Sequence, residues 1–364
     1  MRVRHISIEE LGTFIGSEEF RRMPDLPISS LRARSQASNP LARAEDVALI
    51  LFYEKDELLA YLGLLPDQTI DTAVRFAWMS CIWVSPTARG RGLAGKLLEE
   101  AFNCWEAKLL ATEFTAPAKR LYDKTGRFDD LALKQGIRAY LRLNMADLLL
   151  AKNPKYAPYK SLLRLGDGCF NALNSLRLWW KKTSRPSNVR LAKFDEVDED
   201  AWQFLKRHAP PTAFQRNRQA LNWLLKNPWL SSDDLARKEQ GRYQFSVYAD
   251  HFEFVGLKIF EGDVLKAWMI LACRNRALKI PYIFLQKGCE AMVAKEVENY
   301  MLSKGLYILT TYDSALRTHW QKHQGTFFLI RPFNRPYLIS KALKSILPVR
   351  EEIFQDGEGD CAFT

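Results

Sequence analysis

The segment VSPTARGRGLAGKLL, residues 84–98, most constrains the fold, because an apolar strand pattern passes through a glycine-rich turn directly into a helical pattern. Backbone amides in the first turn of such a helix have no intrahelical partner and lie at the positive end of the helix dipole. Glycine at positions 90 and 92 lets an anion approach the backbone without meeting a Cβ atom. The segment therefore predicts a phosphate cradle on a strand–turn–helix unit.

Two familiar phosphate cradles do not fit this segment. A nucleoside-triphosphate P-loop needs Gly-Lys followed by Ser or Thr at a fixed spacing, which this segment lacks. Gly90, Gly92 and Gly95 do spell G-x-G-x-x-G. However, the ribose-binding acid and the parallel βαβ unit of a dinucleotide site are missing. The cradle is therefore expected to serve another phosphate-bearing ligand.

Two motifs in the chain resemble the GNAT acyltransferase superfamily. The loop RGRGLA at 89–94, preceded by Val84 and Pro86, resembles the family's acyl-CoA pyrophosphate loop. Farther along, AKRLYDKTGRF at 118–128 resembles the helix after the family's fifth strand, which ends in Tyr and Gly-Phe. The motifs stand in the family's order, and the resemblance covers residues 1–150. The alternative is a helix N-terminus whose glycines serve only close packing.

The resemblance implies a co-substrate and the residues that hold it. In this family the fourth and fifth strands splay apart, and the pantetheine arm of acyl-CoA bonds to the fourth strand. The implied co-substrate is acetyl-CoA or another acyl-CoA, with no metal. Backbone groups of Ile82, Trp83 and Val84 would hold the pantetheine. Backbone amides of the loop would hold the pyrophosphate, namely those of Arg89, Gly90, Arg91, Gly92, Leu93 and Ala94.

Direct attack of an amine on a thioester needs a route for one proton to leave the nitrogen and a proton donor for the departing thiolate. Tyr122 resembles the family's thiolate acid, and a phenol with a pKa of about 10 is protonated at neutral pH. The expected fourth strand, residues 76–84, has no Asp or Glu, so Glu113 and Asp67 are the candidate bases, acting through water. Thr115 stands where many relatives carry Asn. Core packing of Tyr122 and a surface role for either carboxylate are the alternatives.

The pattern restarts beyond residue 187 as an internal repeat. RAYL at 138–141 returns as RPYL at 335–338, and GRF at 126–128 returns as GTF at 325–327. The common order of these matches predicts two copies of one fold, of the α/β class with mixed sheets. Each copy is expected to be a GNAT-like domain, with helices flanking a mostly antiparallel sheet that contains one splayed strand pair.

This repeat gives four expected segments. A catalytic GNAT domain with the pyrophosphate loop covers 1–150, a basic amphipathic linker helix covers 151–186, a degenerate GNAT-like domain covers 187–347, and an acidic C-terminal tail covers 348–364.

The second copy departs from the family at the positions that matter for catalysis. Its strand-to-helix junction has one glycine, Gly288, and Trp320 stands close to the place of Tyr122. The resemblance therefore implies no catalysis there. Three residues of its acceptor-side region are candidates for gripping an anionic substrate: Arg216, Arg218 and Trp223.

The linker is rich in basic residues, since Asp167 is the sole acid between Lys155 and Arg185. Apolar residues recur there at spacings of three and four, namely Leu162, Leu165, Cys169, Leu173, Leu176 and Trp180. A helix of this kind either straps two domains together or lies on an anionic membrane. We expect the strap and keep peripheral membrane contact through 155–185 as the alternative.

Charge and cysteine content limit the partners and the location. Lys and Arg number 53 against 42 Asp and Glu, and the net charge of +11 favours anionic partners. The six cysteines show no C-x-x-C, which argues against a zinc site or a disulfide framework and favours a reducing cytoplasm. The N-terminus lacks the pattern of a cleavable signal, and no apolar run approaches the roughly 18 residues that span a bilayer.

These features together predict a cytoplasmic acyl-CoA-dependent N-acyltransferase, and specifically an N-acetyltransferase. The acyl group passes directly to a primary amine in a ternary complex, and the preferred acceptor is an amino sugar or sugar nucleotide of surface polysaccharide synthesis. One alternative is a non-catalytic CoA- or nucleic-acid-binding protein, to which ten tryptophans and the positive charge are suited. Another is a peptidoglycan-type aminoacyl transferase, against which the intact loop argues. The oligomeric state stays open.

Overall fold

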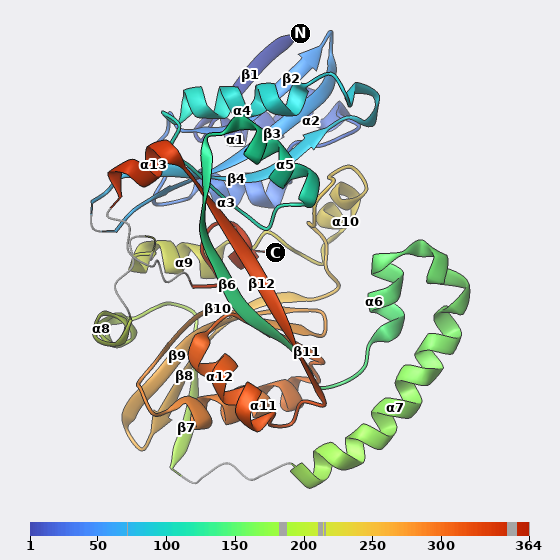
Figure 1. The fold of residues 1–364 in the computed structure, drawn as a ribbon, viewed down its shortest axis with the longest axis vertical. Coiled ribbons are helices and arrows are strands. Elements are labelled where there is room, and N and C mark those ends of the chain that lie inside the picture. The colour runs from blue at the N-terminus through green and yellow to red at the C-terminus, as the bar shows by residue number, and fades with distance from the viewer. Residues whose placement is uncertain (71, 182–187, 210–213, 215, 348–354, 364) are drawn as a thin grey trace.

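One 12-stranded sheet runs through the computed structural model, which describes residues 1–70, 72–181, 188–209, 214, 216–347 and 355–363. The strand order is β1-β2-β3-β4-β5-β12-β6-β11-β10-β9-β8-β7. Figure 1 shows the first half of the chain at the top and the second half at the bottom, with the long strands β6 and β12 crossing between them. The expected mixed α/β class is confirmed.

The first half has the order β-α-α-α-β-β-β-α-β-α-β, with one short 3-10 turn. Its elements are β1 (Arg2–Ser7), α1 (Glu10–Gly16), α2 (Glu18–Arg22), α3 (Ser30–Ala37), β2 (Val47–Glu54), β3 (Glu57–Gln68), β4 (Arg75–Val84), η1 (Pro86–Ala88), α4 (Leu93–Cys104), β5 (Leu109–Thr112), α5 (Ala116–Thr125) and β6 (Phe128–Tyr140).

The second half repeats this order of helices and strands. Its elements are β7 (Val189–Phe194), α8 (Glu199–His208), α9 (Arg218–Lys226), α10 (Asp234–Gln240), β8 (Phe252–Glu261), β9 (Val264–Arg274), β10 (Ala277–Leu285), α11 (Glu290–Lys304), β11 (Ile308–Thr311), α12 (Ser314–His323) and β12 (Leu329–Ser340). Helix α13 (Lys341–Ile346) and the 3-10 turn η3 (Cys361–Phe363) follow. The internal repeat is confirmed by this element order.

The two halves exchange their final strands. β6 pairs antiparallel with β11 of the second half, where Tyr140 lies opposite Ile308. β12 pairs antiparallel with β5 of the first half, where Tyr337 lies opposite Thr112. β6 and β12 also pair with each other, from Leu329 to Ser340 on β12. Each half therefore completes its sheet with a strand from the other half.

Residues 355–363 are inserted between the two halves. Phe363 is fully buried and stacks on Trp229 with ring centroids 4.1 Å apart, in an apolar cluster that also contains Trp78 and Trp268. Figure 1 places this end of the described chain near the centre of the molecule. Within the expected acidic tail, residues 348–354 and Thr364 lie outside the described residues.

Residues 145–181 form a helical arm beside the body of the protein (Figure 1). The arm consists of α6 (Met145–Lys152), η2 (Pro154–Tyr159) and α7 (Lys160–Lys181). A helix is thus present in the expected linker. The expectation that it straps the two domains together through its apolar face is wrong, because the apolar side chains do not face the two halves. Five of them are 62–78 % exposed: Leu162, Leu165, Leu173, Leu176 and Trp180. The basic residues Lys182 and Arg185 and the boundary at Ser187 lie outside the described residues.

None of the helices in the described ranges is long and apolar enough to cross a membrane.

Candidate active site

The glycine-rich segment forms the turn between β4 and α4. Gly90 and Gly92 adopt left-handed backbone, with φ of 83° and 73°. Gly92 is the N-cap of α4, so no side chain caps the free amides of the first helical turn. Among the described residues, a Cβ atom at Gly90, Gly92 or Gly95 would meet nothing within 4 Å, so there is open space beside this turn. The loop thus fits an anionic group such as a pyrophosphate.

The other predicted loop residues frame this cradle. Leu93 is 3 % exposed and anchors the start of α4 in the core, while Ala94 is half-buried behind it. The side chains of Arg89 and Arg91 are exposed. The guanidinium of Arg91 pairs with both carboxylate oxygens of Glu54, at 2.6 and 3.1 Å. Backbone amides, rather than these two side chains, therefore shape the cradle.

Strands β4 and β5 part next to this loop. Their parallel pairing ends at Met79 opposite Ala111, whereas β4 continues to Val84, and among the described strands only β3 pairs with this last part. Cys81 is the extra residue of a β-bulge in β4 and has φ of 45°. The predicted splay is therefore present, and one backbone edge of Ile82–Val84 faces the gap.

A cavity of about 250 Å³ lies at this gap. Its lining combines β4, the turn after β5, α5, the second half and the segment 355–363; the polar or aromatic members include Arg32, Ser80, Cys81, Glu113, Tyr122, Trp229, Phe245 and Asp360. The first half alone would therefore leave this cavity incomplete.

Tyr122 lines the cavity from α5. Thr115 caps this helix with its hydroxyl, and Gly126 ends it in left-handed backbone. The Tyr122 ring is 4 % exposed and packs edge-on against Phe114, with centroids 5.8 Å apart. Burial, with a smaller effect from the charge of Asp360, raises the pKa of Tyr122 above its usual range. The phenol therefore keeps its proton at neutral pH, as a proton donor requires.

The two predicted bases lie in different surroundings. Glu113 follows β5 with φ of 51° and lines the cavity, and one of its carboxylate oxygens forms an ion pair with Arg335 of β12. Asp67 is 3 % exposed in β3 and accepts hydrogen bonds from Trp78 Nε1 (2.9 Å) and from the amide of Gln68 (2.8 Å). Burial raises the pKa of Asp67. The structure brings Glu113 to the cavity but does not bring Asp67 there.

Asp360 is an acidic group at the cavity that the sequence analysis missed. Its carboxylate accepts a hydrogen bond from the hydroxyl of Ser80, which in turn accepts one from Arg32. Arg32 also reaches the Cys81 thiol (2.6 Å) and donates to the Tyr243 hydroxyl (3.2 Å). Burial raises the pKa of Asp360 above its ordinary value. A carboxylate with a raised pKa is a stronger base than an ordinary carboxylate.

Basic side chains of the second half hold Asp360 in place by binding its neighbours. Arg216 donates to the carbonyl oxygen of Gly359 (2.6 Å), and Lys279 donates to that of Cys361 (2.9 Å). Arg216, which was expected to bind an anionic substrate, thus forms a hydrogen bond with the protein's own backbone.

The other two residues predicted to bind an anionic substrate, Arg218 and Trp223, also have hydrogen-bond partners within the protein. Arg218 pairs with Glu199 (2.8 Å) and donates to the carbonyl of Val197 (2.7 Å). Trp223 is buried and donates to the carbonyl of Ser35 (2.8 Å).

The sequence of residues 15–126 matches the model of the acetyltransferase (GNAT) family. This part of the chain is a GNAT acetyltransferase domain. The fold is also similar to that of a conserved protein of unknown function from Enterococcus faecalis V583, described as a probable N-acyltransferase. That likeness has a TM-score of 0.51 at 12 % identity and covers 96 % of this chain and 74 % of that one.

Two further solved structures resemble the chain. A putative acetyltransferase from Pyrococcus horikoshii has a TM-score of 0.48 at 10 % identity, over 98 % of this chain and 95 % of that one. A tandem GNAT protein from the clavulanic acid biosynthesis pathway has a TM-score of 0.48 at 11 % identity, over 93 % of this chain and 98 % of that one. The curated proteins contain no match.

The loop and the phenol of the GNAT domain are replaced in the second half. Glu290 at the start of α11 accepts the amide of Gly288 (3.0 Å), so an acidic side chain occupies the place where an anion would bind. Trp320 is the seventh residue of α12, as Tyr122 is of α5, and it donates to Glu298 (2.8 Å). At these positions the second half thus has an acidic side chain bound to the backbone of the turn and a tryptophan in place of the phenol.

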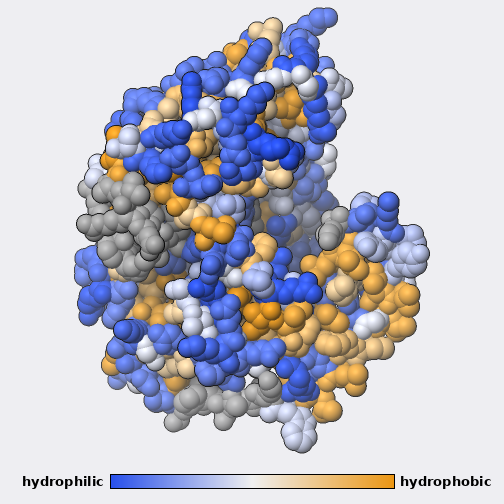
Figure 2. Space-filling model, in the orientation of Figure 1, coloured by the Kyte–Doolittle hydropathy of each residue, from blue (hydrophilic) through white to orange (hydrophobic). Residues whose placement is uncertain are grey.

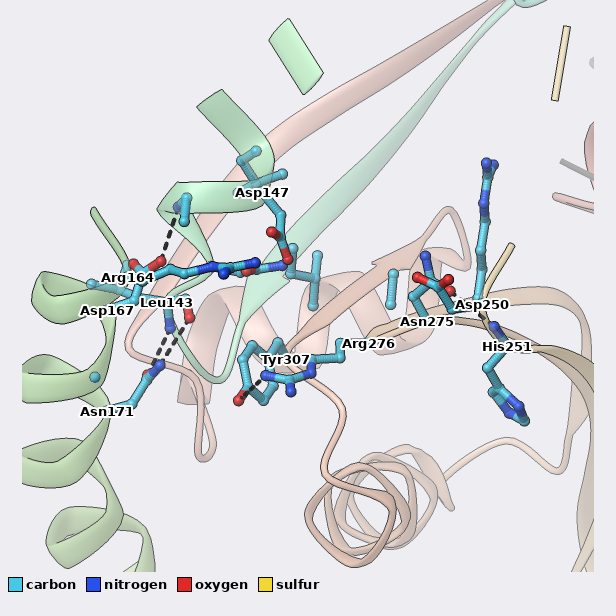
Figure 3. Close-up of a pocket in the computed structure, with 17 residues that line it drawn as sticks. Leu143, Asp147, Arg164, Asp167, Asn171, Asp250, His251, Asn275, Arg276 and Tyr307 are labelled. Atoms are coloured by element: carbon cyan, nitrogen blue, oxygen red, sulfur yellow. Dashed lines mark hydrogen bonds between the residues drawn. The ribbon is translucent and has the colours of Figure 1, made fainter. Parts of the chain in front are cut away.

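A second and larger cavity, of about 1070 Å³, separates the arm from the second half. In Figure 3, Asp147 and Arg164 of the arm lie across it from Asn275 and Arg276 of the turn between β9 and β10. Arg276 donates to the hydroxyl of Tyr307 on the same wall. The predicted site residues do not line this cavity, and among the described residues no group of three or more His, Cys, Asp or Glu side chains is placed to hold a metal ion.

Proposed function

We propose that the chain is an acyl-CoA-dependent N-acyltransferase that moves an acetyl group directly to a primary amine in a ternary complex. The observation that carries the proposal is one cavity at which the open edge of β4 meets both Tyr122 and Asp360. The GNAT domain supports acyl-CoA-dependent acyl transfer in general. Acetyl-CoA and the roles of individual residues are part of the proposal.

Acyl-CoA binding is assigned to backbone groups of the first half. The amides from Arg89 to Ala94 hold the pyrophosphate, because the glycines leave open space in front of a helix N-terminus. The free edge of Ile82–Val84 holds the pantetheine arm. The thioester at the end of that arm then reaches the cavity between the splayed strands.

The proposed reaction moves two protons. The amine nitrogen attacks the thioester carbonyl carbon, so that a C–N bond forms and the C–S bond breaks. Tyr122 gives its proton to the departing thiolate, and Asp360 accepts the proton that leaves the nitrogen, directly or through water. Transfer of that proton from Asp360 to the phenolate restores both groups. Glu113, with one oxygen held by Arg335, is our second candidate for the base.

The proposed acceptor is an amino sugar or sugar nucleotide of surface polysaccharide synthesis, within the wider class of small-molecule and glycan amines. The lining of the cavity supports this class of acceptor. The polar groups of Arg32, Ser80 and Asp360 and the aromatic rings of Trp229 and Phe245 line the same cavity. A few convergent polar groups among apolar walls are typical of small-ligand sites.

The halves are proposed to have different roles. Residues 1–150 form the catalytic domain, and 187–347 form a non-catalytic GNAT-like domain that contributes to the acceptor side through Trp229 and Phe245. A cytoplasmic location is part of the same proposal.

Release of free CoA thiol tests the proposal. The purified chain is mixed with acetyl-CoA and a panel of primary amines that includes amino sugars, nucleotide-linked amino sugars, amino acids and polyamines. We expect amine-dependent thiol release with at least one sugar amine. Binding of acetyl-CoA without turnover of any amine would favour the non-catalytic CoA-binding alternative, and absence of acetyl-CoA binding would refute both.

A further inference from the structure

Helix α7 of the arm turns its polar face towards the body of the protein. Asn174 donates to the carbonyl of Leu141 (2.8 Å), and Asn171 both donates to and accepts from the backbone of Leu143, at 2.9 Å in each case. Arg177 donates to a backbone carbonyl of the second half (2.6 Å). Polar groups thus carry much of the attachment of the arm, in contrast to an ordinary surface helix, whose apolar stripe faces the core.

The opposite face of α7 is apolar and points away from the protein. Its large members are 62–78 % exposed: Leu162, Leu165, Leu173, Leu176, Trp179 and Trp180. Tyr156 and Tyr159 of η2 are also exposed and extend the face towards the tip of the arm. Figure 2 shows this hydrophobic surface gathered over the arm at the lower right. A continuous apolar surface of this kind marks a contact site, because scattered single residues are the norm on soluble proteins.

The charges of the arm favour a negatively charged contact. Between Pro154 and Lys181 the only acidic residue is Asp167. Its carboxylate points inward and accepts the amides of Met145 and Ala146 at the start of α6, at 2.9 Å each. Two exposed lysines of this stretch, Lys155 and Lys160, lie outside the cavity between the arm and the second half, whereas Arg164 lines that cavity. Both lysines belong to the segments that carry the apolar face, η2 and α7, and the diameter of a helix, about 10–12 Å, is comparable to the Debye length of roughly 8–10 Å.

We propose that the arm docks the protein on an anionic lipid surface. Helix α7 lies in the plane of the headgroups with its leucines in the acyl region, and Trp179 and Trp180 sit at the interface, where indole rings are favoured. The exposed lysines, Lys155 and Lys160, are attracted to the anionic headgroups. This inference does not depend on the acyl-transfer proposal.

The charges of the arm also favour a lipid surface over a second copy of the chain as the partner of the apolar face. Self-association through the apolar face would place two identical faces together, as a twofold contact requires. The exposed lysines of both copies would then repel each other, and Asp147, the exposed acid of α6, lies at the cavity on the other side of the arm. An anionic bilayer instead covers the leucines and neutralises the cations.

Vesicle sedimentation with the full chain tests the proposal. The probes are vesicles of phosphatidylcholine alone and vesicles that also contain phosphatidylglycerol. We expect binding to the anionic vesicles that weakens as salt is raised, and roughly tenfold or greater loss of affinity in the double variant Leu173→Asp with Leu176→Asp. Because both side chains point outward, the melting temperature and acetyl-CoA affinity of this variant should stay unchanged.

The matched control is Leu133→Asp, which changes a leucine on β6 that is 61 % exposed and lies outside the arm. It should keep vesicle binding intact. Failure of the unmodified chain to bind anionic vesicles, or equal binding to neutral ones, would overturn the proposal. So would a stable dimer that binds no vesicles and dissociates in the arm variant, since a second copy would then cover the face.

Discussion

The hydroxyl of Ser80 donates a hydrogen bond to the carboxylate of Asp360, although 280 positions separate the two residues in the chain. Ser80 lies just past the point where β4 leaves β5, and Arg32 donates to its hydroxyl from α3. This contact fixes a carboxylate with a raised pKa at the cavity that also contains Tyr122. The proposed base thus comes from a segment far from both motifs of the GNAT domain.

Replacing Asp360→Asn keeps an oxygen that can accept from Ser80 but removes the proton acceptor. We expect kcat to fall by roughly 10²- to 10⁴-fold while acetyl-CoA affinity stays nearly constant. The acid form of Asp360 cannot act as a base, so the rate of the unmodified protein should rise as pH passes through the raised pKa of Asp360. The variant should lack this rise in its pH–rate profile. Glu113→Gln is the control and should have the smaller effect; the reverse ranking would assign the base to Glu113.

Replacing Gly92→Val places a branched side chain in the open space before α4. Acetyl-CoA affinity should fall at least roughly tenfold, or about 1.4 kcal/mol, by calorimetry. Gly288→Val is a matched control, because its φ of 91° is also left-handed and valine is strained at both positions. Equal losses of acetyl-CoA affinity in the two folded variants would contradict a single site in the first half.

Replacing Tyr122→Phe keeps the buried ring and removes its proton. If the phenol protonates the thiolate, kcat should fall by roughly 10²- to 10⁴-fold with little change in acetyl-CoA binding. Steady-state thiol release with an active acceptor measures this. An unchanged kcat would mean that Tyr122 serves only to pack against Phe114.

The stability of the protein should depend on the protonation of Glu358. This residue is 1 % exposed, and burial raises its pKa to about 8. An unfolded Glu has a pKa of about 4.3. Between these values the folded state holds a proton that the unfolded state has lost, so the free energy of unfolding should fall as pH rises. Urea unfolding at several pH values measures that slope.

Glu358→Gln stays neutral throughout this range and should flatten the slope. Exposed Glu45→Gln is the comparison and should leave the slope as it is in the unmodified protein. An unchanged slope in Glu358→Gln would show that this carboxyl is not the group responsible.

Features determined by neighbouring residues could be predicted from the sequence. The glycines at 90 and 92 require an open strand-to-helix turn, and Gly126 ends the helix that carries Tyr122. The repeat could be predicted from short motifs in the same order, although these motifs do not occupy equivalent places: Ile137 lies opposite the last residue of β11, whereas Tyr337 lies opposite the last residue of β5. These predictions depend on backbone conformation within a few residues, which local sequence largely determines.

Features that depend on distant segments could not be predicted in the same way. Asp360 reaches Ser80 from a segment whose backbone Arg216 and Lys279 bind on either side of it. In α7, the spacing of Leu173 and its neighbours predicts an apolar face but gives no direction for it. The direction follows from Asn171 and Asn174, which bind the backbone of the body and so turn the leucines outward.

The exchange of β6 and β12 bears on how the protein is made. A ribosome that has synthesised only the first half has produced β5, yet the strand β12 that covers its open edge begins at Leu329. During that interval the nascent chain exposes an unpaired strand edge, which is prone to aggregation. Maturation of the first half therefore has to wait for translation of the second, and a chaperone that shields strand edges would find its substrate in that interval.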